Sequence, residues 1–177
     1  MNSIQRPLQG EYGPNFQKYV DMVPDGDFTK VLSQNTQEAI RFFQNIPAGK
    51  YDHRYAVDKF TIKEVLIHII DVERVMAYRA LVAARADNKT ILYKIDVDLY
   101  VQQADVSRRA FEDIVDEFKI VRAATEKFFE TVTESQSIFP ATTTTHPVTA
   151  RALGYIIIGH LMHHMIIMKE KYLQTHE

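Results

Sequence analysis

Three histidines fall within five positions near the carboxyl end of the chain, in the stretch GHLMHHMIIMKEKY at 159–172. Successive residues of a helix turn by about 100°, so His160 and His164 share one face and lie one turn apart. The other residues on that face are apolar, namely Leu153, Ile156, Ile157 and Ile167. We therefore expect the pair to point into a helical bundle, where a divalent metal ion would satisfy both ring nitrogens.

A metal site needs a third ligand, because a His-x-x-x-His pair alone is weak evidence for a metal. His68 is the candidate, since it lies in EVLIHIIDVERV on an otherwise apolar stripe of an earlier helix. Three imidazoles that leave a fourth position open to water or substrate are typical of catalytic metal sites. The alternative is that each histidine is a core residue hydrogen-bonded to a neighbour, and the spacing alone leaves both interpretations open.

Other polar residues near these histidines also have two interpretations. Glu64 precedes His68 by one turn and could hydrogen-bond an imidazole or act as a catalytic base toward water. Its simpler role is a capping box with Thr61 at the start of the helix. Asp71 follows His68 by three residues and could orient an imidazole or be an ordinary surface acid. His163 points about 100° away from the 164 position, toward a neighbouring helix, an opening or the surface edge.

The composition excludes several other classes of site. The chain has no Cys, so it has no disulfides, thiolate ligands or Cys nucleophiles. Leu161 stands where the base of a His-Glu-x-x-His zinc protease would lie, and no helix carries the Glu-x-x-His motif of di-iron bundles. The formal net charge is -2 with both signs interspersed, so we expect no nucleic-acid partner. Without a signal peptide or an uncharged apolar run of about 18 residues, we expect a cytoplasmic protein that makes no membrane contact.

Long helices must position these histidines. The chain has 177 residues, of which 46% are hydrophobic, and this is enough for one substantial core. Strand signals are scarce, and Gly and Pro cluster outside the stretches that have helical spacing. Those stretches are 27–45, 61–86, 107–132 and the region from Pro147 to about Leu173. We predict a single all-α domain, 1–177 with its core at about 27–173, folded as a four-helix bundle with a long crossover at 87–106 between helices 2 and 3.

The last helix is apolar nearly all round, with Ile158, Met162 and Met165 on the side opposite His160. Such a helix is either surrounded by the others or forms a dimer seam, and we expect a homodimer. Crossover residues could cover the mouth of the site and select substrate, or be ordinary loop packing: Tyr93, Asp96, Asp98 and Tyr100. Three charged residues of the second helix are expected to be structural, paired with charges on the third: Glu73, Arg74 and Arg79.

Three stretches together resemble the DinB-like (YfiT-like) superfamily of metalloenzymes in their order and spacing. They are RPLQGEYGPNFQKYV, RYAVDKFTIKEVLIHIIDVERVMAYRALVAARAD and RALGYIIIGHLMHHMIIMKEKYL. The resemblance implies a four-helix bundle that holds a divalent metal through His68, His160 and His164. Phe60 stands where the family often has a Trp, a conservative change that should spare the metal site.

Family members with an activity resemble either thiol-dependent S-transferases, in which the metal activates a small thiol, or metal-dependent hydrolases. We therefore predict a metal-dependent enzyme that activates water or a low-molecular-weight thiol on a small-molecule substrate. Zn²⁺ or Ni²⁺ is the expected metal, although three imidazoles also suit copper and ferrous iron. The alternatives are a metal-binding or stress-related bundle protein without turnover, and a homodimeric bundle whose histidines are merely structural.

Overall fold

The computed structural model describes residues 4–174, and these residues are mainly helical, as predicted. Within this part of the chain four helices are long: α2 (Phe28–Gln44), α3 (Ile62–Ala84), α5 (Phe111–Thr131) and α7 (Ala150–Ile167). α7 continues as a π-helical turn, η4 (Met168–Tyr172). The shorter elements are helices α1 (Gln17–Met22), α4 (Val97–Ala104) and α6 (Glu134–Ser137), and the 3-10 turns η1 (Pro14–Phe16), η2 (Ala48–Lys50) and η3 (Val106–Arg108).

The long helices begin at side-chain caps that the sequence encodes. Asp27 accepts from the backbone N–H of Lys30 at the start of α2, and Thr149 caps α7. At the start of α3, Thr61 and Glu64 form the expected capping box. The third long helix begins at Phe111 and not near residue 107 as predicted, because Asp105 has a positive φ of 39° and the next residues form η3.

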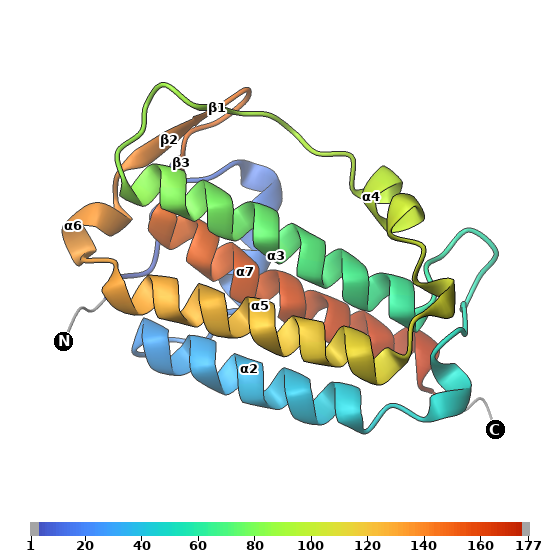
Figure 1. Cartoon of the computed structure of the whole chain (residues 1–177). Helices are drawn as coiled ribbons and strands as arrows, with labels where there is room; N and C mark the ends of the chain where they lie inside the picture. The colour runs from blue at the N-terminus through green and yellow to red at the C-terminus, as the bar shows by residue number, and fades with distance from the viewer. Residues whose placement is uncertain (1–3, 175–177) are drawn as a thin grey trace.

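The direction of the four long helices is plain from the colour order in Figure 1. α3 and α5 run the same way, opposite to α2 and α7. The chain from 85 to 110 therefore travels back along the bundle to connect the end of α3 with the start of α5 (Figure 1). This segment is not a plain loop, since it contains β1, α4 and η3.

A small sheet lies beside the end of the bundle where α3 finishes and α7 begins (Figure 1). Its strands are β1 (Ile91–Leu92), β2 (Pro140–Thr143) and β3 (Val148–Thr149). The central strand β2 pairs with β1 in parallel and with β3 in antiparallel orientation. We did not predict these strands. Each is at most four residues long, and Pro140 occupies the first position of β2, where a proline is tolerated.

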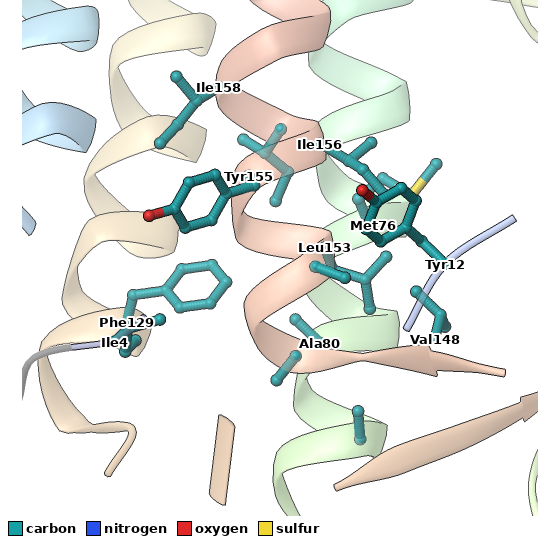
Figure 2. Close-up of a cluster of buried hydrophobic side chains, with 14 of the residues drawn as sticks. Ile4, Tyr12, Met76, Ala80, Phe129, Val148, Leu153, Tyr155, Ile156 and Ile158 are labelled. Carbon is teal, nitrogen blue, oxygen red and sulfur yellow. The ribbon is translucent and has the colours of Figure 1, made fainter. Parts of the chain in front are cut away.

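α7 is the central helix. Every residue from 150 to 161 is buried, and Ile158 is wholly inaccessible to solvent. The first two thirds of α7 are thus covered within one chain, and no second copy is needed to cover Ile158, whereas Met162 is partly buried and Ile166 is exposed. By length and composition the region Ala150–Tyr172 could cross a membrane, but most of it is buried inside the protein, as expected for a core helix. Figure 2 shows Leu153 and Ile156 of α7 packed among side chains of the neighbouring elements.

Charged residues tie α3 to α5, as predicted. Glu73 and Arg122 form a fully buried ion pair with 2.8 Å between Oε2 and Nη2, although the angles fall outside hydrogen-bond geometry. Arg74 pairs with Glu117 of α5 at 2.7 Å. Arg79 departs from the prediction, because it donates to the backbone carbonyl of Tyr93 in the crossover at 2.7 Å instead of pairing with α5.

Candidate metal centre

The structure brings His68 of α3 together with His160 and His164 of α7. The Nε2 atom of His160 lies 3.2 Å from Nε2 of His68 and 3.1 Å from Nε2 of His164. One ligand-type nitrogen from each of the three rings falls within 4.8 Å of the others. His68 and His160 are buried and His164 is nearly so, which makes the cluster an interior feature of the bundle.

Burial keeps these imidazoles neutral at physiological pH. It lowers the pKa of His68 to about 4, although the charge of Asp98 acts in the opposite direction. It likewise lowers the pKa of His164 to about 3. The pKa of His160 is held well below its usual range by burial and by the neighbouring His164 and His68. Neutral imidazoles present lone pairs, which is the form that binds a metal ion.

Hydrogen bonds among the rings cannot satisfy this arrangement. A neutral imidazole nitrogen has one in-plane direction, in which it either carries a proton or offers a lone pair. Nε2 of His160 therefore cannot make a full hydrogen bond to both His68 and His164, although both approach it closely. Three nitrogens bound to one tetrahedral ion at about 2.0–2.1 Å would stand about 3.3 Å apart, close to the two separations seen here. The donor set thus fits a divalent metal ion.

The site has a wall that the sequence patterns did not reveal. Tyr19 of α1 packs the edge of its ring against His160 and His163, with centroid distances of 5.5 Å and 5.4 Å. This approach depends on Gly159, because a Cβ at that position would fall 2.8 Å from Cα of Tyr19 and still closer to its carbonyl group. His163 is thereby placed at the edge of the cluster, beside the aromatic ring of Tyr19.

The acids predicted near His68 have other partners. Oε2 of Glu64 accepts from the backbone N–H of Thr61 at 2.7 Å, and Oε1 accepts from Nη2 of Arg54 at 2.9 Å. Its role as a catalytic base stays a prediction, whereas its capping role is plain. Asp71 forms an ion pair with Arg74 at 3.3 Å, and burial raises its pKa.

Among the predicted crossover residues, the structure distinguishes Asp98. It is exposed in the first turn of α4, and its negative charge raises the pKa of His68 against the larger effect of burial. Asp96 caps α4 by accepting from the backbone N–H of Leu99 at 3.0 Å. Tyr93 and Tyr100 are exposed, and the carbonyl of Tyr93 accepts from Arg79.

Together, the fold and this site define a mainly helical protein with three neutral imidazoles gathered in its interior. The sequence matches the model of the DinB superfamily over residues 32–168, so the chain belongs to that superfamily. A search of curated proteins finds no match.

A solved structure with a similar fold is that of YfiT from Bacillus subtilis, described as a probable metal-dependent hydrolase with an unusual four-helix bundle topology. The two structures align with a TM-score of 0.71 and 14% sequence identity, covering 94% of this chain and 91% of the other. This likeness concerns the fold, and His68, His160 and His164 are assigned from the geometry of this chain.

Proposed function

We propose that this protein is a metal-dependent enzyme whose divalent ion is held by His68, His160 and His164. The observation that carries the proposal is the position of Nε2 of His160, which lies within 3.2 Å of two other imidazole nitrogens and can hydrogen-bond only one of them. Zn²⁺ or Ni²⁺ suits a set of three imidazoles. The description of YfiT as a probable metal-dependent hydrolase agrees with this assignment.

When bound, such an ion supplies Lewis acidity, which lowers the pKa of a water or thiol nucleophile and polarises the group that is attacked. The protein contributes a rigid ligand set, because His160 and His164 lie one turn apart on the central helix and His68 faces them from α3. The Tyr19 ring covers His160 and keeps bulk water from that side of the cluster. We propose hydrolysis of a small molecule as the reaction, with a low-molecular-weight thiol as the other candidate nucleophile.

Two carboxylates are candidates to accept a proton from the nucleophile. Glu64 precedes His68 by one helical turn, but its oxygens accept from Thr61 and Arg54. Asp98 is exposed in the first turn of α4, and its charge acts on His68. Glu64→Gln and Asp98→Asn distinguish the two, because removal of the base should lower kcat at least tenfold and leave the metal content unchanged.

A turnover screen tests the proposal. Untagged protein, first stripped with chelator and then reloaded with one equivalent of Zn²⁺ or Ni²⁺, is offered small esters and amides, and separately a small thiol with an electrophilic acceptor. Turnover that appears only on reloading and is lost in His160→Ala supports the enzyme. Tight metal binding without turnover of any substrate class would favour the alternative, a metal-binding protein without catalysis.

The proposal also covers how the long helices are arranged and where the protein works. We propose that α2, α3, α5 and α7 form a four-helix bundle in which the segment 85–110 is the crossover, and that the protein works in the cytoplasm. A homodimer stays a prediction. Since residues 150–161 of α7 are buried, the dimer contact would form at exposed apolar side chains, for which Tyr78, Leu81 and Ile120 on the α3–α5 surface are candidates.

A further inference from the structure

A cavity of about 350 Å³ lies between the sheet end of the bundle and the chain that leads into α1. Its floor is apolar and buried, made by Met76 of α3, by Leu153 and Ile156 of α7, and by Leu92 and Val148 of the sheet. Figure 2 shows Met76, Leu153, Ile156 and Val148 grouped at the contact between α3 and α7. A cavity of this size accommodates a small organic molecule.

The rim of the cavity is polar and carries charge of one sign. Arg79 and Lys94 contribute two cations, while His146 and the threonines at 143–145 add further polar groups. No lining residue is an Asp or a Glu, although the whole chain has 23 acidic residues against 21 basic ones. The cavity is therefore a local site of positive charge in a protein with a slight net negative charge.

Arg79 is the most informative residue of the rim. One of its terminal nitrogens, Nη2, donates to the carbonyl of Tyr93 at 2.7 Å, and Nη1 faces the sulfur of Met76 at 3.9 Å. Within residues 4–174 no carboxylate lies within ion-pair distance of its guanidinium. The guanidinium is about half-buried, and this burial lowers the pKa of Arg79. A partly desolvated guanidinium without an acidic partner is a ready binding group for an oxyanion.

The cavity lies along the same two helices as the histidine cluster. Ile156 precedes His160 by one helical turn on α7, and Met76 follows His68 by two turns on α3. Because α3 and α7 are antiparallel, both residues lie on the side of the histidines that faces the sheet end of the bundle (Figure 1). The helical rise places the cavity floor roughly 6–12 Å from the histidines. Phe16, which lines the cavity, has its ring 6.3 Å from that of Tyr19, the residue that packs on His160.

We propose that this cavity binds the substrate as an organic oxyanion with an apolar body, the anionic group at Arg79 and Lys94 and the reactive end toward the histidines. The proposal rests on the proposed function for the reaction itself, but binding in the cavity requires no metal. The apolar floor selects against inorganic anions and highly hydroxylated molecules, because these would leave buried polar groups unpaired. The absence of acids on the rim selects against cations.

The test is isothermal titration with three eight-carbon probes of the same chain length: octanoate, octyl phosphate and the neutral octanamide. Each is titrated into the full-length protein as purified and again after removal of metal with chelator. The variants are Arg79→Gln and Lys94→Gln, and the matched control is Arg85→Gln. Arg85 is an exposed cation six residues further along the chain, directly after the end of α3, and it does not line the cavity.

At least one anion should bind tenfold or more tightly than octanamide, and the tighter of the two identifies the anionic group. Arg79→Gln should remove that preference, Lys94→Gln should weaken it several-fold, and Arg85→Gln should leave it unchanged. Lys94 is exposed, so its variant remains informative even if the protein with Arg79→Gln is poorly folded. Equal binding of octanamide and both anions, or full anion binding by both cavity variants, overturns the proposal.

The two proposals fail separately in this design. If the anion binds through Arg79 but the protein takes up no Zn²⁺, the cavity stands and the metal-dependent function falls. If Zn²⁺ binds and the anion preference is missing, the cavity assignment falls and the metal site stands.

Discussion

Replacing Gly159 with Ala is the most direct test of the contact that places α1 against the histidine cluster. The new Cβ would fall 2.8 Å from Cα of Tyr19 and closer to its carbonyl, and these are backbone atoms that cannot rotate away. The α1 backbone must therefore retreat by about 1 Å to restore normal contact distances. Because Tyr19 packs on His160 and His163, this retreat loosens the wall of the site as well as the core.

The size of the effect follows from two opposing contributions. Overpacking of a rigid core destabilises the folded state by up to about 3 kcal/mol, whereas the higher helix propensity of Ala than of Gly stabilises it by about 1 kcal/mol. The free energy of unfolding should thus fall by about 2 kcal/mol, which for a domain of this size lowers the unfolding temperature by roughly 4–8 °C. The affinity for Zn²⁺ should fall with it, because His160 loses its aromatic neighbour.

Differential scanning calorimetry of the metal-free protein and a Zn²⁺ competition titration measure the two effects. Gly49→Ala is the control, since a Cβ at that position meets no atom within 4 Å. We expect the control to keep the wild-type unfolding temperature and metal affinity. A Gly159→Ala protein that matches wild type in both measurements would refute the inferred packing of Tyr19 against α7.

Two further predictions concern buried charge. Changing Arg122 to Met leaves the Glu73 carboxylate buried without its partner, and should lower the free energy of unfolding by about 3–5 kcal/mol in chemical denaturation; a loss below 1 kcal/mol would contradict this. His68 has a folded-state pKa near 4 against a usual 6.5, so the unfolded chain binds the extra proton and stability is lost as pH falls from about 6.5 to 4. For His68 alone, urea unfolding of the metal-free protein should show a loss of about 2 kcal/mol between pH 7 and pH 5. His164 acts in the same direction, the loss should shrink in His68→Leu, and equal stability at both pH values would contradict the burial of neutral imidazoles.

The long helices and the burial of the histidines on their apolar faces follow from sequence pattern alone. His68 and His160 lie on apolar stripes, and an apolar stripe of a helix is buried against another helix whatever the details of packing. The capping box of Thr61 and Glu64 is equally local, since it depends on residues three positions apart. These features require no knowledge of tertiary contacts.

Other parts of the site depend on tertiary contacts and leave no periodic signal. Tyr19 lies on a helix of only six residues, and its place beside His160 is set by close approach to a glycine of α7. The strand that begins at Pro140 exists because β1 and β3 pair with it.

The three-histidine cluster as a metal site is the central claim, and metal stoichiometry tests it most directly. Untagged wild-type protein and the variants His68→Ala, His160→Ala and His164→Ala are equilibrated with Zn²⁺, freed of excess metal and measured by inductively coupled plasma mass spectrometry. His53→Ala, which alters a histidine beside Tyr172, is the control. We predict about one ion per chain for wild type and control, and loss of the ion in each of the other three proteins that retain the helical circular dichroism of wild type. An unchanged stoichiometry in any of those three would contradict the assignment of that histidine as a ligand.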